Sequence, residues 1–361
     1  ATIPILIVPY YSVIGGWVIK YLIEYFAGHS KTLAGDAYFT TFISNGWSTE
    51  ICFIIFTLFT LGIIYAGVRN GIERVSKFMM PILIVLSLII AVYSVTRPGA
   101  IEGVKYFLVP NFDHFSWMTV VSAMGQMFYS LSIAMGILIT FGSYMKKDTS
   151  IEKSTENVEI FDTAIAIMAG LMIIPAVFAF SGGNAETLKS GPALMFITIP
   201  KVFANMGFGT AIGVVFFLLV LFAAVTSSIA LTESAVSTFE DELHWSRKKS
   251  TVFMGMVMLL LGTLSCLGYG PLANFKILGM QFLDFFDFIT NSVMMPIAAI
   301  ATCLLVSKVV GVDKIEEEIK KDGQAFRRKK IFCFMIKYLC PLFAAIILIS
   351  SVANAFGIIT M

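Results

Sequence analysis

Long apolar segments alternate with polar linkers along the whole chain, and this pattern predicts helices that cross a membrane. Nine of the segments come close to the roughly 20 residues that a helix needs to span a bilayer. We expect them, to within a few residues, at 1–27, 48–66, 78–96, 117–145, 156–180, 207–238, 251–268, 278–306 and 332–356. The hydrophobic pattern therefore predicts an all-α, polytopic membrane protein.

The segment 117–145 has a polar interruption at its centre, the run GQMFYSLSIAMG between Gly125 and Gly136. The segment holds no charged residue, and as one straight helix it would exceed the roughly 30 Å of the hydrocarbon core. A helix broken here would offer the hydroxyls of Ser130 and Ser132 and nearby carbonyls to a cation, and the N–H groups of its second half to a carboxylate. In the alternative interpretation these small and polar residues only pack a helix interface.

Lys and Arg are concentrated in every second linker. The loops 67–77, 146–153, 239–250 and 307–331 hold most of the Lys and Arg, and the positive-inside rule places such loops in the cytoplasm. With 58% hydrophobic and 13% charged residues and a mean hydropathy of +0.87, the chain is not a soluble protein and needs a lipid bilayer. Its net charge of +2 is too small to indicate a nucleic-acid partner.

Two linkers are expected to carry structure of their own. Residues 185–204 combine a Ser-Gly-Pro turn signal with an apolar run too short to span, which predicts an extracellular re-entrant or surface hairpin. Residues 314–322 place opposite charges at helical spacing, which predicts a solvated cytoplasmic helix.

A cluster of hydroxyls, Thr226-Ser227-Ser228, lies near the middle of the segment 207–238. Together with the carbonyl of Ala223, one turn earlier, these hydroxyls would form an oxygen cluster that suits a cation. In the alternative interpretation they bond to carbonyls of their own helix or hold neighbouring helices together.

Three acidic residues lie in or near apolar segments. Asp162 is about two turns into the segment 156–180, and an intramembrane carboxylate suggests a function, neutralised by a cation or a proton. Alternatively the helix starts later and Asp162 stays in water. Asp284 and Asp287 share a face near the start of 278–306, where they either guard a path or simply favour the positive end of the helix.

The sequence contains none of the motifs of hydrolytic or nucleotide chemistry. G-x-S-x-G, H-E-x-x-H and the P-loop are absent, and the three histidines lie in loops or at segment ends. We therefore do not expect an enzyme.

Several runs of the sequence together resemble the bacterial branch of the neurotransmitter:sodium symporter family. In chain order they are GVRNGIERVSKFMMP, GQMFYSLSIAMG with SYMKKD downstream, IPAVFAF, FAAVTSSIALTES and FEDELHWSRKK. One run alone is weak, but the ordered set is specific and covers nearly the whole chain. The resemblance implies the leucine-transporter fold, an inverted-repeat helical bundle with a broken central helix, here the segment 117–145.

The resemblance also assigns two sodium sites by position. Ser130 and Asp162 match the first site, and Ala223, Thr226 and Ser227 match the second. Many members have Asn where this chain has Asp162, and an acidic residue near this position in bacterial members is thought to replace the chloride that animal members need. The resemblance thus implies that chloride is not required.

Substrate and gate residues follow from the same correspondence. The tyrosine that bonds the substrate carboxylate in the family is matched by Tyr11. The full set implied for the substrate site is Ile7, Tyr11, Phe128, Tyr129, Ser130, Ser132, Met135, Val225, Ser228 and Leu231. The implied gate residues are Asp287 on the extracellular side and Asp241 and Tyr144 on the intracellular side.

The chain departs from the family in lacking a match to the first two transmembrane helices, which supply part of both sodium sites. We expect residues 1–361 to form a single transporter domain of nine spans, corresponding to the third to eleventh helices of the family, within a longer protein. The chain opens with Ala and reaches its first charge only at Lys20, which fits this expectation.

The sequence thus predicts a sodium-coupled amino-acid symporter that works by alternating access in the inner membrane of a bacterium. The apolar residues Ile7, Met135 and Leu231 predict a hydrophobic or aromatic substrate. Two alternatives stand: a proton-coupled transporter or channel that uses Asp162 as its titrating group, and a transport-inactive fragment or substrate sensor.

Overall fold

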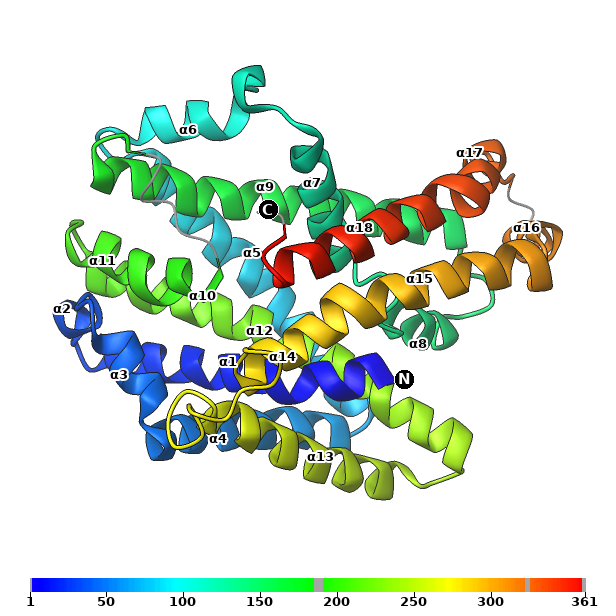
Figure 1. The fold of residues 1–361 in the computed structure, drawn as a ribbon, viewed down its shortest axis with the longest axis horizontal. Coiled ribbons are helices and arrows are strands. Elements are labelled where there is room, and N and C mark those ends of the chain that lie inside the picture. Colours follow the sequence, from blue (N-terminus) through cyan, green and yellow to red (C-terminus); the bar gives the residue numbers. More distant parts are fainter. Residues whose placement is uncertain (1, 185–190, 322–324, 359–361) are drawn as a thin grey trace. The chain divides into compact units, whose positions relative to one another are not determined.

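The computed structural model describes residues 2–184, 191–321 and 325–358, and nearly all of them lie in helices (Figure 1). The only β contact among the described residues is an isolated antiparallel bridge between Ile277 and Met280. The predicted all-α class is therefore confirmed.

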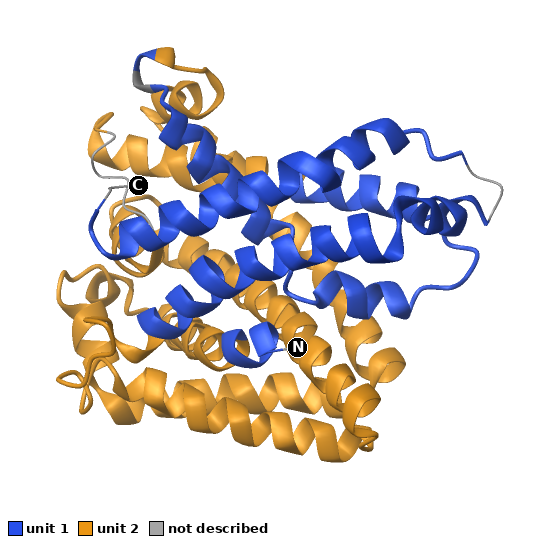
Figure 2. Ribbon diagram, turned by 45° about the vertical axis from the view of Figure 1, so that its right-hand side comes forward, with its two compact units in different colours: residues 1–7, 113–163, 284–361 blue, residues 8–112, 164–283 orange. Residues whose placement is uncertain are grey.

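The chain forms two compact units, and each is described by itself (Figure 2). Unit 1 comprises residues 1–7, 113–163 and 284–361. Unit 2 comprises residues 8–112 and 164–283. That the two act as one transporter domain stays a prediction.

Unit 2 contains most of the long helices, and two of them, α1 and α9, begin in unit 1. Its elements are α1 (Thr2–Phe26), α2 (Ser30–Leu33), α3 (Tyr38–Ser44), α4 (Gly46–Tyr65), η1 (Val68–Glu73), α5 (Arg74–Val95), α6 (Ala100–Leu108), α9 (Ile151–Ser181), α10 (Gly191–Ala193), η4 (Leu194–Thr198), α11 (Ile199–Ala204), α12 (Gly209–Leu243) and α13 (Arg247–Leu267).

Unit 1 takes the remaining helices, with η2 (Phe112–His114) and α14 (Phe282–Asp287) at its borders. Its elements are α7 (Trp117–Ser130), α8 (Ile137–Ser143), η5 (Phe288–Met294), α15 (Met295–Leu304), η6 (Leu305–Val310), α16 (Val312–Lys320), α17 (Lys329–Phe334), η7 (Met335–Leu339) and α18 (Cys340–Ala355). The helix α16 occupies most of the linker 314–322, where the charge pattern predicted one.

Eight helical stretches in the described part of the chain are long and apolar enough to cross a membrane. They are Thr2–Phe26, Gly46–Tyr65, Val68–Val95, Ile151–Ser181, Gly209–Leu243, Arg247–Leu267, Phe282–Val310 and Lys329–Ala355. Each corresponds to one of the expected segments. The remaining segment, 117–145, consists of the two shorter helices α7 and α8, so the predicted break of the central helix is confirmed.

An aromatic cluster packs the core of unit 2. Trp17 of α1 contacts Phe39 and Phe196 edge to face, with ring centroids 5.3 and 5.8 Å apart, and Tyr21 stacks on Phe217 at 5.2 Å. The Tyr21 hydroxyl donates a hydrogen bond to the Phe196 carbonyl at 2.8 Å. These contacts remove both polar and aromatic groups of α1 from lipid.

The expectation of a re-entrant or surface hairpin at residues 185–204 is wrong for the part of this linker that the structure describes. Residues 185–190 lie outside the described residues, and 191–204 form one continuous helical stretch instead of a hairpin. Phe196, Val202 and Phe203 are buried in unit 2. The apolar run therefore serves packing inside the unit, which the pattern of a short surface segment did not reveal.

Helices α1, α4 and α13 come close together in unit 2, and glycines allow the approach. A Cβ atom at Gly16 of α1 would lie 2.6 Å from the backbone nitrogen of Phe53 in α4, and one at Gly262 of α13 would lie 2.2 Å from the Phe53 ring. Small residues of this kind let membrane helices pack at short distance.

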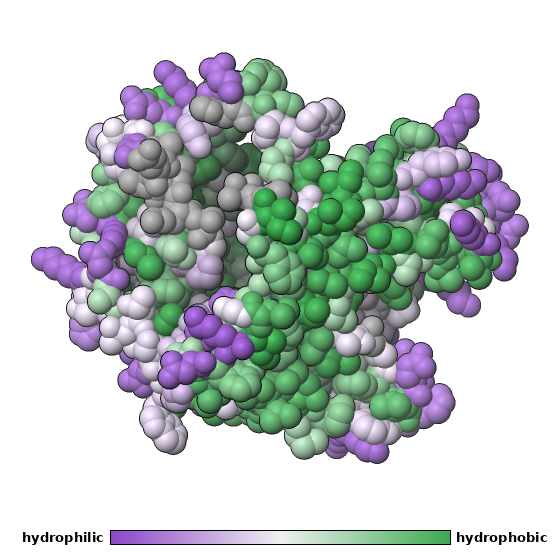
Figure 3. Space-filling model, viewed as in Figure 1, coloured by the Kyte–Doolittle hydropathy of each residue, from purple (hydrophilic) through white to green (hydrophobic). Residues whose placement is uncertain are grey.

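In unit 1, α18 packs against both α15 and α7. The buried residues of the pair α15 and α18 include the small Ala299 and Ala344. In Figure 3 the surface over these two helices is hydrophobic, and hydrophilic residues gather at the end that carries α16. Both helices expose large apolar side chains, as lipid contact requires: Ile297, Leu304, Leu342 and Ile349.

We expect Gly16→Ala to lower the free energy of unfolding by about 1–3 kcal/mol, because the added methyl group meets backbone that cannot move aside. Gly62→Ala is the matched control, since Gly62 lies in α4 with no atom within 4 Å of its Cβ position. The control should be neutral or stabilising by up to about 1 kcal/mol, as for Gly to Ala in a helix. Unfolding of the two purified variants in the same detergent measures the difference, and equal behaviour would contradict the packing described.

Candidate functional site

The break in the central helix of unit 1 lies between Ser130, which ends α7, and Ile137, which begins α8. Three residues of the connection adopt positive φ angles: Ser132 at 54°, Ala134 at 64° and Gly136 at 81°. For a residue other than glycine this conformation costs on the order of 1–3 kcal/mol, so the surrounding structure must hold it in place. Strain of this kind is concentrated at functional sites.

The break also removes backbone hydrogen bonds from the helical ladder. The Met135 amide donates to the Ser132 carbonyl at 3.4 Å, where a regular helix would direct it to Leu131. The regular pattern resumes when the Thr140 amide donates to the Gly136 carbonyl at 3.0 Å. Carbonyl oxygens released in this way are suitable ligands for a hard cation.

Ser130 and Asp162 meet at this break. The Ser130 hydroxyl donates a hydrogen bond to Oδ1 of Asp162 at 2.6 Å. Helix α9 begins at Ile151, so Asp162 lies about three turns inside the helix and is half-buried. The helix therefore does not start after Asp162, and the placement of Asp162 in the membrane and not in water stays a prediction.

The hydroxyl cluster of α12 in unit 2 is bonded in part to its own helix. The Thr226 hydroxyl donates toward the carbonyls of Phe222 and Ala223, each 3.0 Å away. This is the back-bonding that the sequence left open as an alternative. It also leaves the lone pairs of the Thr226 oxygen free and fixes that oxygen beside the Ala223 carbonyl, so the two form an oxygen pair on one helix face.

Tyr11 of α1 is hydrogen-bonded to Ser227 of α12. The contact joins two residues of unit 2 that the resemblance assigned to different sites, the substrate site and the second sodium site. Spacing along the sequence does not predict this pair, because 216 positions separate the two residues.

Ser228 has a partner that the sequence analysis missed. Ser228 is fully buried, and the Thr60 hydroxyl of α4 lies 3.3 Å from its oxygen. The signal was present as Thr57 and Thr60, two buried hydroxyls three residues apart in the otherwise apolar stretch 51–65 of α4. Polar residues at such spacing indicate a face turned toward other protein.

The remaining residues assigned to the substrate site are divided between the two units. Val225 and Leu231 are buried in α12 of unit 2. Met135 and Ile7 are buried residues of unit 1. The others of unit 1 lie in the last turn of α7 or in the break itself: Phe128, Tyr129, Ser130 and Ser132.

The residues assigned to the gates occupy exposed positions within two turns of the end of a helical stretch. Asp287 ends α14, and its Oδ1 accepts a hydrogen bond of 2.6 Å from the Asn291 side chain. Tyr144 follows α8, with its ring 6.1 Å from that of Phe141, and Asp241 is exposed in the last turn of α12. Their roles in gating stay predictions.

A buried ion pair joins three helices of unit 2. Glu233 of α12 is fully buried, and its two oxygens accept hydrogen bonds of 2.6 and 3.0 Å from the Arg247 guanidinium of α13. Arg247 also lies 3.4 Å from Glu240 and donates to the Ile64 carbonyl at the end of α4 at 2.9 Å. Glu233 therefore forms a buried salt bridge within unit 2.

These features define a class of protein. One membrane helix is broken, and at the break a hydroxyl meets a carboxylate of a neighbouring helix. This arrangement is typical of secondary transporters with discontinuous helices. The chain belongs to the sodium:neurotransmitter symporter family, whose family model matches residues 40–358.

Two curated relatives are uncharacterized sodium-dependent transporters. YhdH of Bacillus subtilis is 32% identical over 358 residues, which cover 98% of this chain and 78% of that protein. A transporter of Haemophilus influenzae is 30% identical, with 96% and 76% covered. The crystal structure of MhsT in complex with L-phenylalanine matches with a TM-score of 0.84 at 32% identity, over 97% of this chain and 79% of that one.

The match to MhsT agrees with the predicted leucine-transporter fold. Membership in the family makes the chain a multi-pass membrane transporter coupled to sodium, and not an enzyme.

The buried ion pair yields a stability prediction. Replacing Glu233 by Gln should lower the free energy of unfolding by about 3 kcal/mol, because Arg247 loses its bidentate partner in a buried setting. Glu240→Gln removes the longer contact at a partly exposed position and should cost about 1 kcal/mol or less. Chemical unfolding of both variants in detergent compares the two losses, and equal losses would show that the buried pair is not the main contact.

Proposed function

We propose that the protein carries hydrophobic or aromatic amino acids, together with sodium, across the inner membrane of a bacterium by alternating access. The observation that carries the proposal is the contact between Ser130 and Asp162 at the break of the central helix. A carboxylate inside a membrane helix needs a counter-charge, and a break in the adjoining helix supplies further oxygens for one.

The first sodium site is proposed at Ser130 and Asp162. Sodium is a hard cation that prefers oxygen, and this pair offers a hydroxyl and a carboxylate within 2.6 Å of one another. On binding, the ion would replace the hydroxyl proton as the partner of the carboxylate. Because Asp162 carries the negative charge itself, chloride is not needed to balance the ion.

The second sodium site is proposed at Ala223, Thr226 and Ser227. The Ala223 carbonyl and the Thr226 hydroxyl lie 3.0 Å apart, a spacing at which one cation can contact both. Ser227 is bonded to Tyr11. In this proposal sodium coordinates the Ser227 oxygen, and the hydrogen bond between Ser227 and Tyr11 breaks. The Tyr11 hydroxyl can then bond the substrate carboxylate, so ion binding and substrate binding favour each other.

The proposed substrate class follows from the apolar residues that the family resemblance assigns to the substrate site. Ile7, Met135, Val225 and Leu231 are all buried and apolar. MhsT, with 32% identity, was crystallised with L-phenylalanine, which supports an apolar or aromatic amino acid here. The ammonium group of such a substrate would meet carbonyls released by the break at 131–136.

Alternating access is proposed to use the assigned gate residues in turn. Tyr129 and Asp287 would close the extracellular side once ions and amino acid are bound. Contacts of Tyr144 and Asp241 would then break to open the cytoplasmic side. The strained connection between α7 and α8 provides a hinge at which one half of the helix can move without the other.

We expect the purified full-length protein to bind labelled L-phenylalanine in sodium and at least tenfold more weakly when potassium replaces sodium. The double variant Thr226→Val with Ser227→Ala should lose this dependence, because it removes both hydroxyl ligands of the second site. Thr238→Val is the matched control: Thr238 lies in α12 and bonds back to the Ser234 carbonyl at 2.8 Å, away from the proposed site.

Replacing chloride by gluconate should leave binding unchanged. Sodium-dependent binding in the double variant would contradict the second ion site. Binding to the wild type that does not depend on sodium would contradict sodium coupling itself. A protein that binds in sodium yet carries no flux would be a sensor.

A further inference from the structure

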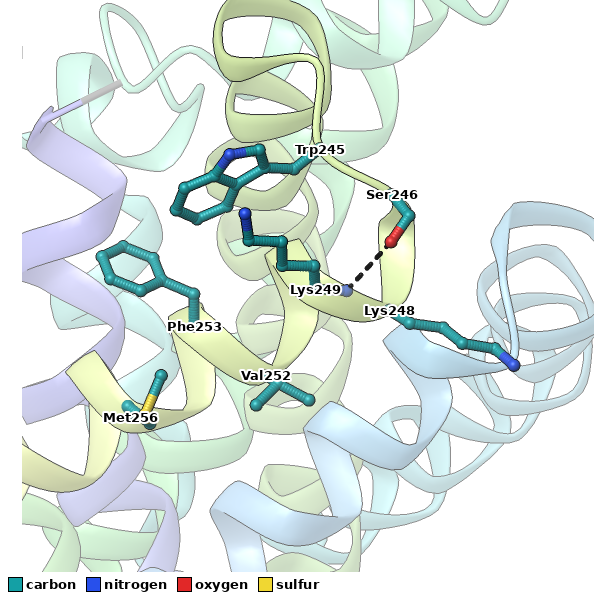
Figure 4. A pocket seen from close by; sticks show the side chains of 7 residues that line it. All are labelled: Trp245, Ser246, Lys248, Lys249, Val252, Phe253 and Met256. Atoms are coloured by element: carbon teal, nitrogen blue, oxygen red, sulfur yellow. Dashed lines mark hydrogen bonds between the residues drawn. The ribbon is translucent and has the colours of Figure 1, made fainter.

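A surface pocket of about 450 Å³ lies where the loop after α12 meets α13 (Figure 4). This volume is within the range of about 300–1,000 Å³ that is usual for ligand sites. All of its lining residues come from one stretch of unit 2: Trp245, Ser246, Lys248, Lys249, Val252, Phe253 and Met256. None of them belongs to the substrate, ion or gate residues proposed above.

One wall of the pocket is aromatic. The rings of Trp245 and Phe253 meet edge to face with centroids 5.3 Å apart, and Phe239 of α12 packs against Phe253 at the same distance. The Lys249 ammonium lies 4.0 Å from the centre of the Trp245 ring. This cation–π contact holds one positive charge at the edge of an apolar surface.

The floor of the pocket continues as an apolar stripe along the outside of α13. Val252, Met256 and Leu260 are 57, 57 and 69% exposed, and their spacing of four residues places them on one helix face. The opposite face, with Met254 and Met258, is buried. Because α13 is long and apolar enough to span the bilayer, we expect this stripe to face lipid tails.

Positive charge is concentrated at the end of the stripe nearest the start of α13. Lys248 precedes Val252 by one helical turn, and Figure 4 shows its side chain directed away from that of Lys249, so that the two charges lie on either side of Val252. Within the described residues neither lysine has an ion pair with a carboxylate, whereas Arg247 is neutralised by Glu233. Two unneutralised cations in the first turn of a helix oppose its dipole and favour an anion there.

The pocket lies at the end of unit 2 that the charge pattern assigns to the cytoplasm. Arg247 bonds to the Ile64 carbonyl, and Lys248 lies 5.7 Å from the ring of Tyr65, at the end of α4. The basic linker 67–77 follows directly. Anionic lipids in contact with this end would be those of the cytoplasmic leaflet.

We propose that this pocket binds an anionic phospholipid of the cytoplasmic leaflet. The phosphate and headgroup contact the ammonium groups of Lys248 and Lys249, and one acyl chain follows Val252, Met256 and Leu260 into the bilayer. The combination of charge and apolar stripe argues for a lipid and against a free anion, because inorganic phosphate would use the lysines and leave the stripe unoccupied. A soluble acidic peptide could not follow the stripe into the membrane.

The indole of Trp245 provides a probe inside the pocket. The full-length protein is placed in nanodiscs of phosphatidylcholine that contain increasing fractions of phosphatidylglycerol with brominated chains. The quenching of Trp245 fluorescence is the quenching measured in the wild type minus that measured in Trp245→Phe. Brominated phosphatidylcholine serves as the neutral reference. The proposal predicts half-maximal quenching at a fraction of phosphatidylglycerol about thirtyfold lower than for the neutral lipid, since two lysines near an anionic surface contribute about 2 kcal/mol together.

Charge variants test which residues select the lipid. Lys248→Gln with Lys249→Gln should raise the half-maximal fraction of phosphatidylglycerol by about thirtyfold, and Lys248→Arg with Lys249→Arg should keep the wild-type value. Lys146→Gln with Lys147→Gln is the matched control, because it removes an adjacent exposed lysine pair from another basic linker of the chain. The control should leave quenching by phosphatidylglycerol unchanged.

Three results would overturn the proposal. Equal quenching by the two lipids would mean that Trp245 and the lysines are ordinary interface anchors. An equal loss in the control pair would mean that net charge alone attracts the lipid. Relief of quenching by excess inorganic phosphate, at constant ionic strength, would identify a phosphate site in place of a lipid site.

Discussion

Inside a bilayer every backbone polar group must find a partner in the protein, and this constraint governs the rest of the structure. The eight long helical stretches in the described part of the chain satisfy it through hydrogen bonds within each helix. The break at 131–136 does not, because it strains Ser132 and Ala134 and releases carbonyls from the ladder. Released groups of this kind bind ions or substrate in transporters with discontinuous helices, and we propose that those beside Asp162 bind a cation.

Polar contacts elsewhere follow the same rule, since each joins separate helices within one unit. Tyr11 meets Ser227, Thr60 meets Ser228, and Glu233 is held by Arg247. The contacts of Tyr11 with Ser227 and of Thr60 with Ser228 involve hydroxyls at which the substrate and an ion are proposed to bind. Binding would replace these hydrogen bonds by bonds to the substrate or the ion. The third is bidentate and buried, as expected of a fixed structural contact.

Much of this could be predicted from local patterns in the sequence. Hydropathy located the spans, the polar run located the break in the segment 117–145, and an acidic residue among apolar ones marked Asp162. Partners distant in sequence could not be found in this way, because spacing reports only which residues share a helix face. The pairing of Tyr11 with Ser227, the partner of Ser228, and the burial of 191–204 against the aromatic cluster all depend on how helices pack, which one sequence does not encode locally.

The measurement that tests the central claim most directly is uptake of labelled L-phenylalanine by proteoliposomes of the full-length protein. An inward sodium gradient at equal pH on both sides should drive accumulation in the wild type, and Asp162→Ala should abolish it while the protein remains folded. Accumulation driven by an inward proton gradient without sodium would contradict the account. Asp162 would then be a proton carrier and the break at 131–136 would not be an ion site.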